Sequence, residues 1–270
     1  LDINILEGNI FQHKFDGNDV ILKHEYLFAM DYLSNCLTAY AKTREKIYKE
    51  TFEKLISQFH EYLVKNGPVY EVLAVYAQTL LIIKAYDILG QFPYMNDFFN
   101  LLVEYAYWLM DDGNYQGDHN HGLFQDLALL HISVFLGNVS SADIWKRHAV
   151  KRVNQLFEIA YYDDFTNNEN SILYFQFNNY MYERIFEFCN YYEITGVKYI
   201  EERLEKSKEA FITFAHKDGT FPVIGDGKVF DSEKSNNISC MFPNLGMAVL
   251  KIKETYLSFK SKTVHQLHAH

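Results

Sequence analysis

Two short stretches of the sequence place polar, reactive side chains at the start of predicted helices. The first is Asn120-His121-Gly122, which follows a polar loop and precedes apolar residues at helical spacing. The free N–H groups and positive dipole end of a helix start attract anions, and the Asn120 amide adds a directional donor. His121 adds another donor, or a base near neutral pH. The pattern predicts a carboxylate-binding helix start, although simple capping by Asn120 with a surface His121 remains an alternative.

The second stretch is Glu169-Asn170-Ser171, with Tyr174 just beyond it at the front of another predicted helix. A tyrosine is a weak base unless neighbouring donors stabilise its phenolate, and Arg184 is a candidate donor by its place in the sequence. Glu169 is a candidate substrate-binding residue, with simple helix capping as the alternative. Because the chain has 21 tyrosines, a core position for Tyr174 is the competing interpretation.

An Asn-His pair that holds a carboxylate, next to a tyrosine that moves a proton, fits β-elimination at a uronic acid. Asn120 and His121 would hydrogen-bond the C5 carboxylate and stabilise the negative charge that develops there. Tyr174, or a histidine paired with it, would remove the C5 proton, and a tyrosine hydroxyl would protonate the departing O4. The residues therefore predict a polysaccharide lyase whose product carries a C4–C5 double bond.

Two other functions remain open from the same residues. A glycoside hydrolase would use two carboxylates, Glu169 together with Asp118 or Asp226. A catalytically inactive protein for carbohydrate binding or polysaccharide assembly would bind oligosaccharide and release no product. Metal binding by Asp118, His119 and His121 is a further alternative, although their spacing matches no standard ligand pattern.

Helical periodicity dominates the chain from Tyr26 to His216. Short breaks such as Asn66-Gly67-Pro68 indicate antiparallel hairpins, and without a fixed-period motif we favour an incomplete (α/α) toroid over a solenoid. Residues 246–260 alternate as two short strands. We therefore predict a toroid at 1–235 and, at 236–270, the start of a truncated β-domain, which the family resemblance described below implies is an antiparallel β-sandwich. The predicted helices lie near 24–46, 47–65, 69–90, 94–111, 121–137, 142–160, 171–194 and 198–216.

Composition excludes several classes of partner. The formal charge of −10 argues against nucleic acid, and no run approaches 18 apolar residues, so we expect no membrane span. The same charge would repel an acidic polysaccharide at long range, unless a local basic cleft or a sparsely charged substrate offsets it. Aromatic residues make up 17% of the chain, which suits a packed core and a groove on which sugar rings stack.

The motifs resemble those of the heparinase II/III-like polysaccharide lyases and their alginate-lyase relatives. That family has an Asn-His-Gly helix start, then Glu-x-Ser-x-x-Tyr-His, then Asp-Gly…Pro-x-x-Gly-Asp, and finally a His-x-His-Ala-Asp-like segment. The order and spacing agree over roughly residues 100–270. The matching residues are Asn120, His121 and Gly122; Glu169, Ser171 and Tyr174; Asp218, Gly219, Pro222, Gly225 and Asp226; and His268 and His270.

The resemblance implies an α/α toroid followed by an antiparallel β-sandwich, an acidic polysaccharide or oligosaccharide as partner, and a periplasmic or secreted location. It implies Tyr174 as acid/base and no required cofactor. Some relatives hold a structural zinc in the β-domain, for which His270 would be a ligand. One departure is that the histidine after the tyrosine is Phe175 here, which would alter the substrate or abolish activity. The predicted substrate-binding residues are Glu169, His119, Arg184 and His268.

Overall fold

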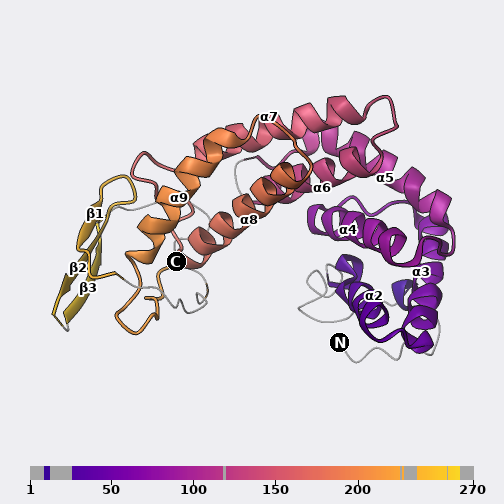
Figure 1. Cartoon of the computed structure of the whole chain (residues 1–270), viewed down its shortest axis with the longest axis horizontal. Coiled ribbons are helices and arrows are strands. Elements are labelled where there is room, and N and C mark those ends of the chain that lie inside the picture. Colours follow the sequence, from indigo (N-terminus) through magenta and orange to yellow (C-terminus); the bar gives the residue numbers. More distant parts are fainter. Residues whose placement is uncertain are drawn as a thin grey trace. The chain divides into compact units, whose positions relative to one another are not determined.

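The computed structural model describes residues 9–12, 26–117, 120–225, 227, 236–253 and 255–261. Over these residues the chain is mostly helical, and a small antiparallel sheet follows the helices in sequence (Figure 1). The helices are η1 (Ile10–Gln12), α2 (Asp31–Thr43), α3 (Lys46–Asn66), α4 (Val72–Leu89), α5 (Met95–Met110), η2 (Asp112–Asn114), α6 (His121–Phe135), α7 (Ala142–Ala160), α8 (Ile172–Tyr191) and α9 (Lys198–Ile212). The strands are β1 (Cys240–Phe242), β2 (Met247–Ile252) and β3 (Thr255–Lys260).

The chain divides into two compact units. The first comprises Leu1–Tyr115 and Phe124–Ala149, and the second comprises Gln116–Leu123 and Val150–His270. Both stretches with predicted chemistry, around Asn120 and around Glu169, therefore belong to the second unit. The boundary predicted at residues 235 and 236 falls inside that unit and stays a prediction.

Helices α2 to α5 of the first unit follow one another with short connections, as the breaks in the sequence predict. Gly67 and Gly90 end α3 and α4 with positive φ angles of 81° and 71°, values that glycine adopts without steric strain. Helix α2 contacts both α3 and α4. The predicted helix over 24–46 is interrupted, because Met30 adopts a left-handed conformation between the helical residues 26–29 and α2.

Helix α4 is the one helix of the described part that has the length and apolar composition of a membrane span. Its polar residues point to another reason for that composition. Gln78 is fully buried and donates to the Phe28 carbonyl at 3.0 Å, while Lys84 donates to Ser34 Oγ at 2.8 Å. Hydrogen bonds of this kind to neighbouring segments are typical of a core helix in a folded domain.

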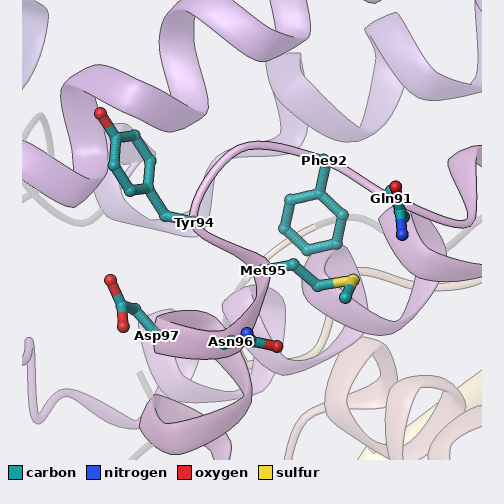
Figure 2. Close-up of a pocket in the computed structure, with 6 residues that line it drawn as sticks. All are labelled: Gln91, Phe92, Tyr94, Met95, Asn96 and Asp97. Atoms are coloured by element: carbon teal, nitrogen blue, oxygen red, sulfur yellow. The ribbon is translucent and has the colours of Figure 1, made fainter.

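The loop between α4 and α5, together with the first turn of α5, lines a pocket of about 370 Å³ in the first unit. Figure 2 shows Tyr94 and Asp97 on the same side of this loop, away from Gln91. The Tyr94 ring stacks on His60 of α3 with centroids 3.8 Å apart, and His60 Nε2 lies 2.8 Å from Asp97 Oδ2. These contacts tie the start of α5 to α3.

In the second unit, α8 and α9 form a hairpin beside the sheet, whose strand order is β1-β2-β3. The inner side of the sheet buries Phe242, Met247 and Val249, and the Phe242 ring stacks on Phe214 at 4.9 Å. The strand pair predicted over 246–260 is confirmed as β2 and β3, with Val249 opposite Ser258. Strand β1 is an addition that sequence reasoning missed.

Candidate functional site

The Asn-His-Gly stretch forms the start of α6. Asn120 is 8% exposed, and its carbonyl accepts the Leu123 N–H at 3.0 Å. His121 Nδ1 lies 2.7 Å from the side-chain oxygen of Gln116. An amide oxygen only accepts, so Nδ1 carries the hydrogen in this contact and the lone pair of a neutral imidazole is at Nε2.

Gly122 is required here by close packing. A Cβ at this position would lie 3.0 Å from the Gln116 carbonyl oxygen and 3.0 Å from Leu156 Cδ2. The first of these neighbours is backbone, which moves less readily than the end of a side chain. The glycine thus lets Gln116 and Gly117 lie directly against the first turn of α6.

We predict that Gly122→Ala destabilises the protein by about 1–3 kcal/mol, because the extra methyl group displaces the turn or strains the packing around it. Urea unfolding of the variant measures the change. Gly113→Ala, at an exposed position of the first unit where the added methyl group would meet only the Asp111 side chain, is the comparison. Equal stabilities of the Gly122 variant and the wild type would contradict this account of the motif.

The turn between α7 and α8 is held by asparagine side chains. Asn167 Nδ2 and the Asn168 N–H both donate to the Ala160 carbonyl, at 3.0 and 2.9 Å, and Asn168 Nδ2 donates to Ile159 at 2.8 Å. Carbonyls at a helix end lack partners within the helix, so these bonds satisfy the end of α7. The turn that carries Glu169 is therefore fixed to a helix at its base.

Glu169 is a buried carboxylate with defined amide partners. Its side chain is 8% exposed, and Oε1 accepts from Asn178 Nδ2 at 3.1 Å. Asn167 Oδ1 accepts from both the Glu169 N–H, at 3.0 Å, and Asn178 Nδ2, at 3.2 Å. The N-cap of α8 is Ser171, whose side chain accepts from Tyr174 N–H. The alternative that Glu169 caps its own helix is therefore wrong.

A buried hydrogen-bond network supports α8 behind Glu169. The Tyr161 hydroxyl and the Ser207 hydroxyl both donate to Asn179 Oδ1, at 2.8 and 2.9 Å. Burial holds the pKa of Tyr161 well above its usual value, and the nearby Glu169 carboxylate raises that pKa further. Tyr161 therefore stays protonated and keeps its donor role, which links α7, α8 and α9.

The structure brings Asn120 and Glu169 into the lining of one very small pocket of the second unit, about 10 Å³ in volume. Asn178 and Tyr182, which sequence reasoning missed, line the same pocket. The available signal was a pair of amides, Asn178 and Asn179, inside an aromatic helical run where apolar residues are expected. The remaining lining residues are Leu123, Leu156, Ile159, Ala160 and Asn168.

Tyr174 lies one helical turn before Asn178, so the two residues share a face of α8. Its side chain is half-buried, and its ring meets Phe177 edge-on at 6.4 Å. It is not among the residues that line the pocket. The competing interpretation, a tyrosine fully within the core, does not describe this position.

The other predicted residues do not line this pocket, or they lie outside the described part of the chain. Arg184 is exposed over the ring of Tyr180 at 6.0 Å, and it is about 15 Å along α8 from Tyr174. Within the described ranges, no group of histidines, cysteines and acids forms a metal site. Outside the described residues lie Asp118, His119, Asp226, His268 and His270.

Arg152, near this pocket, is a third residue that sequence reasoning missed. It is 4% exposed on α7 and lies one turn before Leu156, which lines the pocket and contacts Gly122. The signal was its position on the apolar stripe of α7, between Ala149 and Val153. A buried guanidinium in this layer adds positive charge to a region built mostly of amides.

Phe175 occupies a core position. It is 2% exposed, and its ring lies 5.4 Å from that of Phe211 and 6.3 Å from that of Phe214. The departure from the Tyr-His pattern thus places an aromatic side chain between α8 and the segment that includes the end of α9.

We predict that Phe175→His lowers the free energy of unfolding by about 2–4 kcal/mol, because a polar ring replaces an apolar one in a buried aromatic cluster. Thermal and urea unfolding measure this effect. Phe175→Leu, which keeps an apolar side chain, should cost less. A histidine variant as stable as the wild type would show that the cluster accommodates a polar ring.

Helical hairpins followed by antiparallel strands are the arrangement expected of the predicted fold class, an α/α toroid with a following sheet. The chain belongs to the heparinase II/III N-terminus family, whose sequence pattern matches residues 24–246. No match was found among the curated proteins.

Solved structures share this fold at low sequence identity. A heparinase III structure aligns with a TM-score of 0.73 and 15% identity over 90% of this chain and 45% of its own. The heparan sulfate lyase HepC from Pedobacter heparinus aligns with a TM-score of 0.65 and 15% identity over 82% of this chain and 36% of its own. The chain thus spans less than half the length of either protein. These likenesses confirm the predicted fold class, an α/α toroid followed by antiparallel strands.

Proposed function

We propose that this chain is the helical part of a polysaccharide lyase that cleaves a uronic-acid-containing polysaccharide by β-elimination. The observation that supports this most is the pocket shared by Asn120 and Glu169, with Tyr174 one turn away from it on α8. Membership of the heparinase II/III family supports the same reaction class.

In this mechanism Asn120 donates to the C5 carboxylate of the bound uronate. Removal of the C5 proton spreads negative charge onto that carboxylate, so a fixed donor stabilises the transition state more than the ground state. The N–H groups at the start of α6 act in the same direction. Glu169 accepts hydrogen bonds from sugar hydroxyls, the groups that suit a carboxylate acceptor.

Because Gln116 engages Nδ1 of His121, the role of the other ring nitrogen, Nε2, depends on the protonation state of the ring. With Nδ1–H bound to Gln116, the neutral ring offers Nε2 as a base for the C5 proton. The imidazolium form instead offers Nε2–H as a donor to the carboxylate. With neutral His121 as the base, Tyr174 donates its hydroxyl proton to O4 as the C4–O4 bond breaks and the C4–C5 double bond forms. With the imidazolium form, Tyr174 as a phenolate removes the C5 proton, and its hydroxyl then returns that proton to O4.

The test is to incubate the complete gene product with a panel of uronate polysaccharides and follow ultraviolet absorbance of the unsaturated product. A rise in absorbance supports the lyase. Saturated fragments without a rise would favour a toroid glycoside hydrolase, which Glu169→Gln should inactivate. Binding without any fragments would favour an inactive carbohydrate-binding protein, the alternative that Phe175 supports.

A further inference from the structure

A second pocket of the second unit, separate from the one at Asn120, is basic. It has a volume of about 630 Å³ and lies between the residues that follow α9 and the β2–β3 hairpin. Among the described residues that line it, three are lysines and one is a carboxylate, in a chain whose formal charge is −10. The lining residues are His216, Lys217, Asp218, Thr220, Asn237, Lys251, Lys253, Thr255 and Tyr256.

The walls of this basic pocket are fixed by contacts within the unit. Tyr256 of β3 donates its hydroxyl to the Phe214 carbonyl at 3.0 Å, and its ring lies 4.1 Å from that of His216. Lys251 of β2 is directly opposite Tyr256 in the sheet register, and its ammonium donates to the Asn236 carbonyl at 2.7 Å. A positive charge is therefore held in place at the sheet side of the pocket.

The carboxylate of Asp218, the one found among the described lining residues, is already engaged by its own turn. Asp218 Oδ1 accepts from Thr220 Oγ1 at 2.7 Å and from the Thr220 N–H at 3.0 Å. These hydrogen bonds hold the pKa of Asp218 below its usual range. The aspartate thus serves the turn, and the lysines set the sign of the charge that the pocket presents to a ligand.

The basic pocket is joined to the region of Tyr174 by a short segment of chain. Seven residues after Lys217, the Ile224 carbonyl accepts the Ile172 N–H at the start of α8, at 3.1 Å. Seven residues span at most about 25 Å. The two places are therefore close enough for a single oligosaccharide to reach both.

We propose that this basic pocket binds an anionic group, a carboxylate or a sulfate, on a sugar of the substrate other than the one that is cleaved. This inference rests on the proposed function, because it takes the acidic polysaccharide as its ligand. It also answers the charge conflict of the sequence: local lysines attract the polyanion that the net charge of the chain would repel.

The experiment measures oligosaccharide binding by calorimetry in the complete gene product with Tyr174→Phe, so that the ligand stays intact. The probes are a uronate oligosaccharide, its sulfated counterpart and a neutral oligosaccharide of equal length. The double variant Lys251→Gln/Lys253→Gln should bind the acidic probes about tenfold more weakly, since two charge contacts are lost. Its affinity should also depend less on salt.

Lys206→Gln is the matched control, because this lysine of α9 is exposed and pairs with Glu202 outside the pocket lining. It should leave the affinity unchanged. Loss with both acidic probes assigns the pocket to either anion, and loss only with the sulfated probe assigns it to sulfate. Lys253→Gln alone, at an exposed turn position, decides the matter if the double variant does not fold.

Affinity that is unchanged in the lysine variants, or weakened equally for the neutral probe, would overturn the proposal, as would no binding of any acidic probe. The measurement does not depend on turnover. A protein that cleaves nothing but loses acidic-probe binding in the lysine variants would refute the lyase and retain the pocket. A protein that cleaves normally, but whose binding of the acidic probes is unchanged in these variants, would support the lyase and refute the pocket.

Discussion

Tyr174→Phe is expected to lower the rate of polysaccharide cleavage by about 100- to 10,000-fold, the range for loss of a general acid or base. The substitution removes one hydroxyl and keeps the ring that meets Phe177. Because the hydroxyl acts on O4 in the transition state, substrate affinity should change much less than kcat. Initial rates from ultraviolet absorbance, at several substrate concentrations, separate the two parameters.

Tyr180→Phe is the matched control for this variant. It removes the same hydroxyl from the same helix, at a position that is 53% exposed, and should leave the rate unchanged. Equal activities of the Tyr174 variant and the wild type would remove Tyr174 from the reaction. Equal losses in both variants would point to a general effect on α8.

The second large effect is expected for Asn120→Ala, which should lower kcat by about 100- to 1,000-fold, as does loss of one donor to a developing oxyanion. The amide is 8% exposed and lines the pocket that Glu169 also lines. A donor that acts mainly in the transition state affects kcat more than KM. Steady-state kinetics on the uronate substrate measure both.

Asn120 also stands at a helix start, so a structural effect must be separated from a catalytic one. Loss of an N-cap costs about 1 kcal/mol, which urea unfolding detects. Asn138→Ala, at an exposed turn of the first unit, controls for a general effect of removing an asparagine. A variant that loses only stability, with kcat intact, would leave Asn120 as a capping residue.

The helices were predictable because apolar residues recur with the helical period along nearly every one of them. Breaks in the helices that lack a strong sequence signal were not predictable. Met30 interrupts the first predicted helix in a left-handed conformation that methionine seldom adopts. Strand β1 has three residues and exists through its pairing with β2, a contact between segments that local patterns do not report.

Part of the site could be predicted because its residues stand in two short polar runs at the starts of helices. Asn120 and Glu169 were both predicted, and they line one pocket. Asn178 was missed because periodicity assigns a residue to a face of a helix without naming the loop that packs there. Arg184 was chosen for its nearness to Tyr174 in sequence, yet along a helix ten residues correspond to about 15 Å.

The sheet bears on the prediction that residues 236–270 begin a β-sandwich. Its outer face is apolar and exposed, and in the strand register Leu250 lies opposite Leu257. An exposed apolar sheet face of this kind normally packs against another layer. We propose that a second sheet covers it, as the sandwich interpretation requires. The exposed apolar residues of this face are Met241, Leu250, Ile252, Leu257 and Phe259.

The most direct test of the central claim is cleavage of a uronate polysaccharide in water enriched in heavy oxygen, followed by mass spectrometry of the fragments. Elimination adds no water across the broken bond. The account therefore predicts fragments that take no heavy oxygen from that bond and are one water lighter at the new non-reducing end. Fragments that carry heavy oxygen at the new reducing end and lack the double bond would show hydrolysis and contradict it.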